Sequence, residues 1–278
     1  MSLFGFRSLA VVAVVGVAAC AAMAQGLPAK PPDHVVIVVM ENHASSQIVG
    51  SAAAPYLNKL AGAGAYFSKS FAVAHPSEPN YLALFSGSTH GVTDDRCPLS
   101  YQGPNLALQL LRAGKTFVGY SENLPSAGFT GCTAAGGYAR KHAPWVNFKR
   151  LPASVNQPFN AFPVADFAVL PTVSFVVPSL ANDMHDGTVT AADAWMQKHM
   201  GPYADWAMAH NSLLIVTWDE DDTHHRNQIA TLFHGPMVKT GVYSNRITHY
   251  DVLRTIEAIF GLPYAADAAS ATTISNVW

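Results

Sequence analysis

Short, continuously apolar runs rich in β-branched residues, each bounded by polar or turn residues, restrict the possible folds of this chain most strongly. A strand with one solvated face alternates apolar and polar residues, so a continuous run predicts a strand that is buried on both faces. Such runs occupy 34–40, 65–74, 115–120, 172–177, 212–218 and 228–233. Helical patterns lie between them at 54–61, 79–86, 105–113, 189–210 and 249–260. Alternating strands and helices predict an α/β fold with a doubly wound, mainly parallel sheet.

Composition supports a large buried core and excludes several classes of protein. The chain has 278 residues, of which 50% are apolar and 12% are charged, which excludes intrinsic disorder and a coiled coil. The net charge of −2 gives no basic balance for a polyanion, so we expect no nucleic-acid partner. We expect one domain over 25–278, in which the loop-rich stretch 94–167 forms an insertion or cap over the site.

The N-terminal segment has the three parts of a secretory signal. Residues 1–24 contain one charged residue, Arg7, then the apolar run 9–19 and an A-x-A site that ends at Ala24. This pattern predicts cleavage after Ala24 and a secreted or periplasmic protein. The alternative is acylation of Cys20, which would anchor the protein to a membrane through lipid. We expect no stable membrane span, because no later segment is apolar enough.

Removal of the signal leaves two cysteines, Cys97 and Cys132. Two cysteines in an exported protein pair more often than they stay free, so the sequence predicts a disulfide between them. Both lie in the loop-rich stretch, and the bond would fasten that stretch over the site.

Polar clusters follow four of the predicted strands, at 41–43, 75–80, 182–186 and 219–222. Ligands of open α/β sheets bind beyond the carboxyl ends of the strands. We therefore expect the four clusters to meet at one edge of the sheet. This convergence is the strongest inference from pattern alone.

Two of these clusters indicate a cation site. Glu41 and Asn42 offer oxygen ligands that suit a hard cation, although a carboxylate there is also compatible with a helix cap. The run 219–222 consists of four carboxylates, which a solvated acidic loop would also explain. Their repulsion directly after a core strand favours a cation bound by Asp219 and Glu220. The two carboxylates that follow are expected to be solvated.

Ser77 is the predicted nucleophile. It precedes Pro79, a favoured residue in the first turn of a helix, so its hydroxyl has the alternative role of an N-cap. The orphan amides and dipole of a helix N-terminus would also stabilise an alkoxide or a phosphate. His185 and Asp186 follow a core strand closely, and a purely structural histidine is the alternative there.

Five motifs together resemble the bacterial phosphoesterase family, which includes acid phosphatases and phosphatidylcholine-type phospholipases C and belongs to the alkaline phosphatase superfamily. They are MENHASSQIVG, HPSEPNYLALFSGSTHG, NDMHDG, VTWDEDD and ITHYDVLRTIEAIFGLP, in this order. The resemblance extends over about 34–263. It implies an alkaline-phosphatase-like three-layer sandwich and a metal-assisted nucleophile. Glu41 and Asn42 match the first metal motif, Ser77 the nucleophile, and Asp219 with Glu220 the acidic metal motif.

The resemblance also implies substrate contacts. The turn with Asp183, His185 and Asp186 faces the active site in this family, and Lys141 and His142 match its Y-x-x-K-H-x-P element. His249 matches a late histidine motif, in which Thr248 and Asp251 replace the usual Asn and Ser. The acidic motif lacks the Gly-Gly of the phospholipase C branch, and the chain is shorter than those enzymes. Both departures favour the small phosphatase-like branch.

The predicted reaction is hydrolysis of a small phosphomonoester through a phosphoserine at Ser77. Asn80 would stabilise charge on the phosphoryl group, and His185 or His249 would protonate the leaving oxygen. The cofactor is a divalent cation: Ca²⁺, Mg²⁺ or Mn²⁺ for an all-oxygen ligand set, Zn²⁺ if a histidine joins it. The rivals are a phosphodiesterase or phospholipase C with the same machinery, and a secreted metal- or phosphate-binding protein without turnover. The oligomeric state and the physiological substrate stay open.

Overall fold

The computed structural model describes residues 26–278, so the predicted signal 1–24 and Cys20 lie outside the described residues. Within them, eight strands form the central sheet, in the order β12-β2-β11-β9-β1-β8-β4-β7. Strands β9, β1, β8, β4 and β7 are parallel, whereas β11 is antiparallel to β9 and β2. The bounds are β1 Val35–Met40, β2 Ala65–Phe67, β4 Phe117–Ser121, β7 Asn156–Pro158, β8 Val173–Val177, β9 Leu213–Trp218, β11 Thr231–His234 and β12 Gly241–Tyr243.

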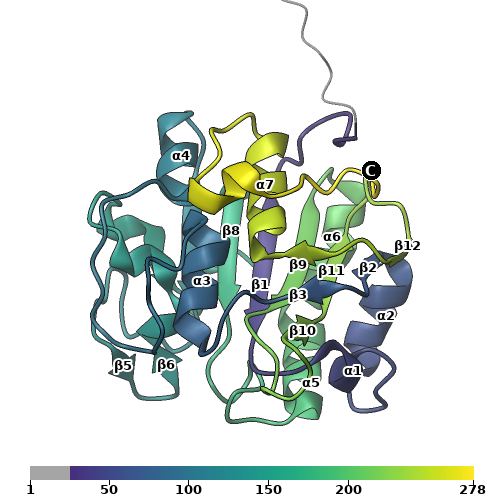
Figure 1. Cartoon of the computed structure of the whole chain (residues 1–278), viewed down its shortest axis with the longest axis horizontal. Helices are drawn as coiled ribbons and strands as arrows, with labels where there is room; N and C mark the ends of the chain where they lie inside the picture. The colour runs from purple at the N-terminus through teal and green to yellow at the C-terminus, as the bar shows by residue number, and fades with distance from the viewer. Residues whose placement is uncertain (1–25) are drawn as a thin grey trace, which may run out of the picture.

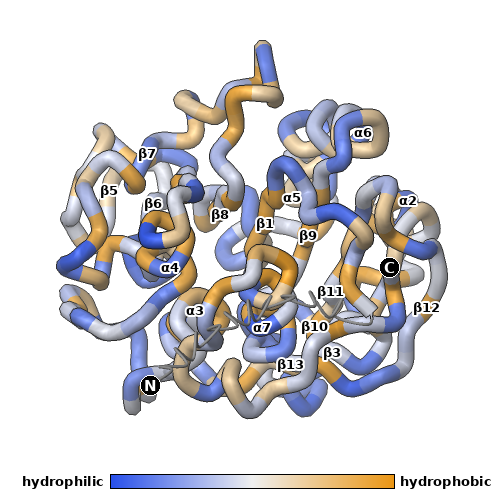
Figure 2. Tube along the Cα trace, turned by 90° about the horizontal axis from the view of Figure 1, so that it is seen from above, coloured by the Kyte–Doolittle hydropathy of each residue, from blue (hydrophilic) through white to orange (hydrophobic). Residues whose placement is uncertain are grey.

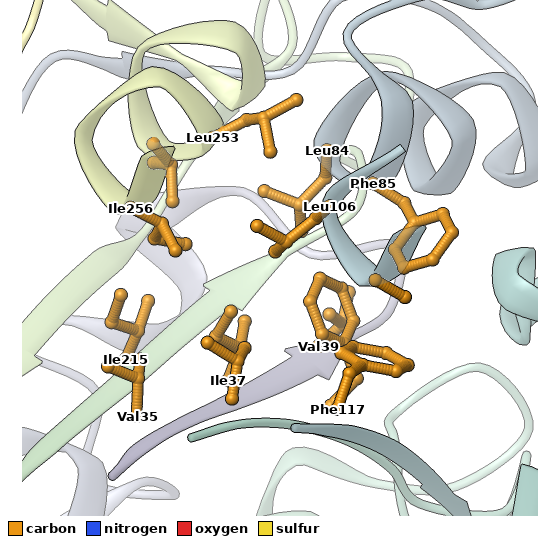
Figure 3. Close-up of a cluster of buried hydrophobic side chains, with 14 of the residues drawn as sticks. Val35, Ile37, Val39, Leu84, Phe85, Leu106, Phe117, Ile215, Leu253 and Ile256 are labelled. Atoms are coloured by element: carbon orange, nitrogen blue, oxygen red, sulfur yellow. The ribbon is translucent and has the colours of Figure 1, made fainter. Parts of the chain in front are cut away.

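Strand β1 lies at the centre of the sheet and is buried on both faces. It pairs in parallel with β8 on one side and β9 on the other. The odd-numbered side chains from Val35 to Val39 join one core, and the even-numbered ones from Val36 to Met40 join the other. Figure 3 shows Val35, Ile37 and Val39 pointing toward the helices of the first core. The continuous apolar run therefore predicted the two-sided burial correctly.

Helices cover both faces of the sheet, which gives the predicted three-layer sandwich (Figures 1 and 2). One layer supplies side chains to the core around Ile37, and the other to the core around Val38. The first layer contains α3 Ser77–Ser86, α4 Leu106–Arg112 and α7 His249–Ile259. The second contains α2 Pro55–Ala63, α5 Val189–His199 and α6 Gly201–Ala209, and a short α1 spans Ser45–Ile48.

Three predicted elements are divided in the structure. One is the run 228–233, which separates into Gln228–Ile229 (β10) and β11, in two different sheets. The run 65–74 separates into β2 and β3 (Ser70–Phe71), and β3 pairs in a second sheet with β10 (Gln228–Ile229) and β13 (Ile247–Thr248). The prediction of a single strand over 65–74 that leads directly into the cluster at 75–80 is therefore wrong, because β3 ends at Phe71. The helix predicted over 189–210 ends before Gly201 and restarts, because Pro202 fits the first turn of a helix but not its interior.

The loop-rich stretch 94–167 contributes α4, β4 and β7 to the main layers. Its remainder contains the hairpin of β5 (Thr133–Ala134) and β6 (Tyr138–Ala139). Most of the 3₁₀ turns lie here too: η1 Arg140–His142, η2 Pro144–Asn147, η3 Ala153–Val155, η4 Phe159–Ala161 and η5 Phe167–Val169, with η6 Ala266–Ser270 near the C-terminus. A disulfide joins Cys97 and Cys132, as predicted, with Cα atoms 5.8 Å apart. In 26–278, no helix has the length and apolar character needed to cross a bilayer.

Candidate active site

Three of the predicted polar clusters meet where β1, β8 and β9 end. The backbone amide of Glu41 donates to the carbonyl of Asp183 at 2.8 Å, and that of Asp219 donates to the carbonyl of Met40 at 2.9 Å. The amide of Asn42 donates to Asp219 Oδ1 at 3.1 Å. Parallel strands therefore bring these residues together as the sequence predicted.

Ser77 is the first residue of α3, and the helix carries it to the same place. The N-cap residue is Pro76, so capping does not occupy the Ser77 hydroxyl. Its Oγ donates instead to Glu41 Oε2 at 3.0 Å and lies 3.3 Å from Glu220 Oε1. The helix-cap alternative for Ser77 is wrong, because its hydroxyl points at two carboxylates.

Glu41, Asp219 and Glu220, here called the acidic cluster, are buried together with exposures of 0%, 1% and 6%. Burial raises the pKa of Glu41 well above its usual range, with Asp219 and Asp183 adding to the effect. Burial also raises the pKa of Asp219 to about 7, helped by Glu220. The pKa of Glu220 likewise rises to about 7, through burial and then Asp95. A nearby positive charge would favour the ionised forms of these carboxyl groups.

The geometry of the acidic cluster fits a divalent cation. One end of the Asn42 amide lies 3.2 Å from Glu41 Oε2 and 3.1 Å from Glu220 Oε1. With its nitrogen there, the amide donates a hydrogen bond to each carboxylate and joins Glu41 to Glu220. Asp219 Oδ2 is buried without a hydrogen-bond partner among residues 26–278. An all-oxygen set of this kind suits Ca²⁺, Mg²⁺ or Mn²⁺.

His142 lies against the other oxygen of Glu41. Its Nε2 is 3.3 Å from Glu41 Oε1, and its Nδ1 is 3.6 Å from Asp183 Oδ2. Burial lowers the pKa of His142 well below its usual range, so the ring is neutral. Glu41, His142 and Asp183 form a group whose ligand atoms all lie within 4.8 Å of one another, which is close enough to hold a metal. His142 thus lies against the same carboxylate that accepts from Ser77.

Lys141 and His185 form the cationic side of the site. Lys141 Nζ donates to Asp95 Oδ2 at 2.8 Å and lies 3.4 Å from His185 Nε2. Burial lowers the pKa of Lys141, but its hydrogen bond to Asp95 and the negative charges of Asp95, Glu41 and Asp219 together outweigh burial, so the net shift is upward and the amine stays charged. His185 Nδ1 lies 2.7 Å from Asp186 Oδ1. The His185 side chain is 27% exposed and that of Asp186 is 61% exposed, so both are accessible.

Asn80 holds the loop before Ser77. Its Oδ1 accepts from the backbone amides of Val73 and Ala74, both at 3.0 Å. Its Nδ2 donates to the carbonyls of Ala74 at 2.9 Å and Pro76 at 3.2 Å. These bonds use the hydrogen-bonding capacity of the amide, so Asn80 is placed to position Ser77 rather than to contact phosphate.

His249 lies behind the acidic loop. Its Nε2 donates to the carbonyl of Asp219 at 2.7 Å, and its Nδ1 has no partner within the described part of the chain. Burial lowers the pKa of His249 to about 4. The ring therefore supports the backbone that carries Asp219, a position that suits orientation of the carboxylate better than proton transfer.

The sequence reasoning missed Tyr81. Its hydroxyl donates to Glu41 Oε1, and its ring stacks on His142 with centroids 4.9 Å apart. Tyr81 comes four residues after Ser77 on α3, and residues at this spacing share one face of a helix. That spacing is the signal that identifies it.

Two residues near Glu220 also belong to the site. His75 Nδ1 contacts Glu220 Oε2, and its Nε2 lies 3.4 Å from Asp221 Oδ1. The prediction that Asp221 is solvated is wrong, because it is 1% exposed. Its carboxylate accepts from the backbone amides of Thr223, His225 and Asn227 at 2.7, 2.8 and 2.7 Å. Asp221 therefore fixes the acidic loop from within.

Comparison with solved structures defines the class of fold. A protein in the alkaline phosphatase superfamily from Vibrio parahaemolyticus superposes with a TM-score of 0.61 at 13% identity, over 88% of this chain and 71% of the other. The lipoteichoic acid synthase LtaP from Listeria monocytogenes gives a TM-score of 0.65 at 13% identity, over 90% and 77%. The chain thus has the fold of the alkaline phosphatase superfamily.

Residues 50–263 match the model of the Phosphoesterase family, and the chain belongs to that family. It is 48% identical to the phosphatidylinositol-3-phosphatase of Mycobacterium tuberculosis, over 98% of this chain and 94% of the relative. It is 31% identical to an acid phosphatase of Aspergillus fumigatus over 73% and 50%, and 29% identical to a probable acid phosphatase of Kluyveromyces lactis over 87% and 63%. The chain therefore spans 50% to 63% of these two fungal relatives. It is a hydrolase that acts on phosphoric ester bonds.

Proposed function

We propose that the protein is a secreted, metal-dependent acid phosphatase that hydrolyses phosphomonoesters through a phosphoserine at Ser77. The observation that carries the proposal is the Ser77 hydroxyl, which lies 3.0 Å from Glu41 Oε2 and 3.3 Å from Glu220 Oε1. A serine hydroxyl held against two buried carboxylates at a helix N-terminus has both a route for its proton and amides that stabilise a phosphate.

Glu41, Asn42, Asp219 and Glu220 would hold the cation. When bound, a divalent cation supplies the positive charge that lowers the pKa of the serine hydroxyl and polarises the phosphoryl group. Two features support this ligand set: the joint burial of the carboxylates of Glu41, Asp219 and Glu220, and the unpartnered Asp219 Oδ2 among residues 26–278. The Asn42 amide, which lies between Glu41 and Glu220, would turn its oxygen toward a bound cation. Recruitment of His142 and Asp183 through Glu41 would favour Zn²⁺ instead.

The reaction has two steps. Ser77 Oγ gives its proton to a facing carboxylate oxygen of Glu41 or Glu220 and bonds to phosphorus, while the bond from phosphorus to the ester oxygen breaks. Because Asp186 holds Nδ1 of His185, Nε2 is the nitrogen that gives a proton to the leaving oxygen. Water then attacks the phosphoserine, which releases phosphate and restores the Ser77 hydroxyl. Lys141 stabilises the negative charge of the phosphoryl oxygens throughout.

A monoester is favoured over a diester by the charge of the site. A phosphomonoester is a dianion near neutral pH and needs more cationic contact than a diester, and Lys141 beside His185 supplies it. The relatives are also named as phosphatases. A phosphoinositide phosphorylated at position 3 is a second candidate substrate, supported by the relative at 48% identity. Secretion is supported by the disulfide and by the signal expected at 1–24.

The test compares p-nitrophenyl phosphate with bis-p-nitrophenyl phosphate, with and without a chelator. We expect rapid release of p-nitrophenol from the monoester only, loss of activity with the chelator, and recovery on addition of a divalent cation. Acid quenching during turnover should leave one phosphate on the wild-type protein and none on Ser77→Ala. Preferred cleavage of the diester would instead establish a phosphodiesterase, and bound phosphate without turnover would establish a binding protein.

A further inference from the structure

A hollow of about 460 Å³ opens beside Lys141 and His185. Part of its wall comes from the β5–β6 hairpin, which Figure 1 shows at the carboxyl-terminal edge of the sheet. The disulfide and the aliphatic side chain of Leu180 also line the hollow. The lining residues are Asp95, Cys97, Cys132, Thr133, Ala139, Lys141, Leu180 and His185.

Asp95 connects the hollow to the nucleophile. Its Oδ1 accepts from the backbone amide of Glu78, the residue after Ser77, at 3.0 Å. Its Oδ2 accepts from Lys141 Nζ at 2.8 Å. One carboxylate thus ties the first turn of α3 to the cation that lies 3.4 Å from His185 Nε2. The hollow therefore starts where His185, the proposed proton donor, and the first turn of α3, which carries Ser77, come together.

The residues that line the hollow exclude a second phosphate and favour an apolar ligand group. The Lys141 ammonium group, which is paired with Asp95, serves the phosphoryl group in the proposed reaction, and the residues that line the hollow include no other lysine or arginine for a second phosphate. Sulfur atoms of the disulfide and the side chains of Ala139 and Leu180 make up much of the remaining wall. A volume of about 460 Å³ is within the range of small-ligand pockets and exceeds what a short alkyl alcohol fills.

We propose that this hollow is the leaving-group subsite, and that it binds the alcohol part of phosphomonoesters with an extended apolar body, such as an aryl or a longer aliphatic alcohol. The inference rests on the proposed function. Asp95 is its positioning residue, because it fixes the wall to α3 without touching the reacting atoms. The disulfide, whose Cys132 directly precedes β5, links the start of the hairpin to Cys97.

The test introduces a large side chain at the rim of the hollow, so that it occupies the proposed subsite. Thr133 is exposed and lines the hollow, so Thr133→Trp places an indole inside without disturbing the core. Ala135→Trp is the matched control, because Ala135 is exposed in the same hairpin turn but outside the lining. The substrates are phenyl phosphate and 1-naphthyl phosphate, whose alcohols have similar acidity and differ by one fused ring.

For Thr133→Trp, we expect kcat/KM for 1-naphthyl phosphate to fall about tenfold or more relative to that for phenyl phosphate. Ala135→Trp should keep the wild-type ratio, and inhibition by inorganic phosphate should be unchanged in both variants. An unchanged ratio in Thr133→Trp, or the same shift in both variants, overturns the subsite. If Thr133→Trp does not fold, Thr133→Leu provides the same comparison. A wild-type protein that hydrolyses neither ester overturns the proposed function, and the subsite with it.

Discussion

The rings of Tyr81 and His142 stack with centroids 4.9 Å apart and planes inclined by 13°, and both side chains contact the same carboxylate oxygen, Glu41 Oε1. This pair holds one oxygen of Glu41 in place. The other oxygen, Oε2, is thereby turned toward Ser77 and Asn42. Residues from α3 and η1 thus orient a carboxylate that belongs to β1.

Tyr81→Phe tests this orientation. The change removes the hydroxyl and keeps the ring that stacks on His142, so the fold should survive. Groups that hydrogen-bond to a metal ligand raise metal affinity by about 10- to 100-fold, and we expect a loss of that size. A titration of metal-stripped protein with Mn²⁺, followed by calorimetry and by activity, measures it. Wild-type affinity in Tyr81→Phe would contradict the role given to the hydroxyl.

Ser77→Ala and Asp219→Ala separate the nucleophile from the cation ligands. Ser77→Ala should abolish turnover but keep metal and vanadate binding, because the four oxygen ligands stay. Its thermal stability should change little, since the Ser77 hydroxyl does not cap α3. Asp219→Ala should lose metal, activity and thermal stability together, because a cation that binds only the folded state stabilises it. Metal analysis and unfolding curves distinguish the two, and an active Ser77→Ala enzyme would refute the phosphoserine mechanism.

Stabilisation by a cation should depend on pH. Without a cation, the folded-state pKa of Asp219 and Glu220 is about 7, whereas in the unfolded chain it lies near 4. The folded state binds more protons between these values, so this contribution to stability is present at low pH and lost as the pH rises through about 7. A divalent cation replaces these protons. We therefore expect it to raise Tm more at pH ~7.5 than at pH ~5.

The contribution of His249 to the pH dependence of stability is opposite in sign to that of Asp219 and Glu220. Burial lowers its pKa to about 4, so its contribution to stability is lost as the pH falls below the unfolded value of ~6.5. The His249 contribution is present with and without the cation. It therefore largely cancels when the Tm measured without the cation is subtracted from the Tm measured with it at the same pH. An increase in Tm of equal size at both pH values would show that the cation does not bind at the acidic cluster.

Reduction of the Cys97–Cys132 bond should affect substrate binding before it unfolds the sheet. The bond closes a loop of 35 positions, and the chain-entropy model assigns such a loop about 4 kcal/mol of stability. Its atoms line the hollow beside Lys141, so KM should rise while the far-ultraviolet circular dichroism stays native. The double variant Cys97→Ser/Cys132→Ser, assayed without reductant, is the control. Parallel loss of activity and circular dichroism would contradict this order of events.

The sequence identified the parts of the site that follow buried strands. The apolar runs before Glu41 and before Asp219 correctly predicted β1 and β9, which end at the same edge of the sheet. This was possible because a buried strand is recognised from a short stretch of sequence. The division between β2 and β3 was missed, although the polar residues Ser68 and Lys69 form the turn between them, because the apolar residues on both sides were interpreted as one run. The burial of Asp221 was also missed, because its partners are backbone amides that only the folded loop presents.

Contacts between distant segments were the least predictable. Asp95 meets the amide of Glu78 and the ammonium of Lys141 only after the stretch 94–141 has folded back over α3. Neither its spacing nor its neighbours mark it as different from Asp94, which is exposed and pairs with Arg96. A functional role for such a residue can be inferred only from the folded structure.

The burial of β1 on both faces has a consequence for how this scaffold can change. Glu41 extends from a strand that two cores hold between β8 and β9, so the carboxylate cannot shift without disturbing both cores. The β5–β6 hairpin, in contrast, is a two-stranded element outside the central sheet, and its turn is exposed. Substitutions in that hairpin can therefore alter which esters are accepted while the phosphoryl-transfer groups stay fixed, which makes residues 133–139 the natural place to begin a library for new substrates.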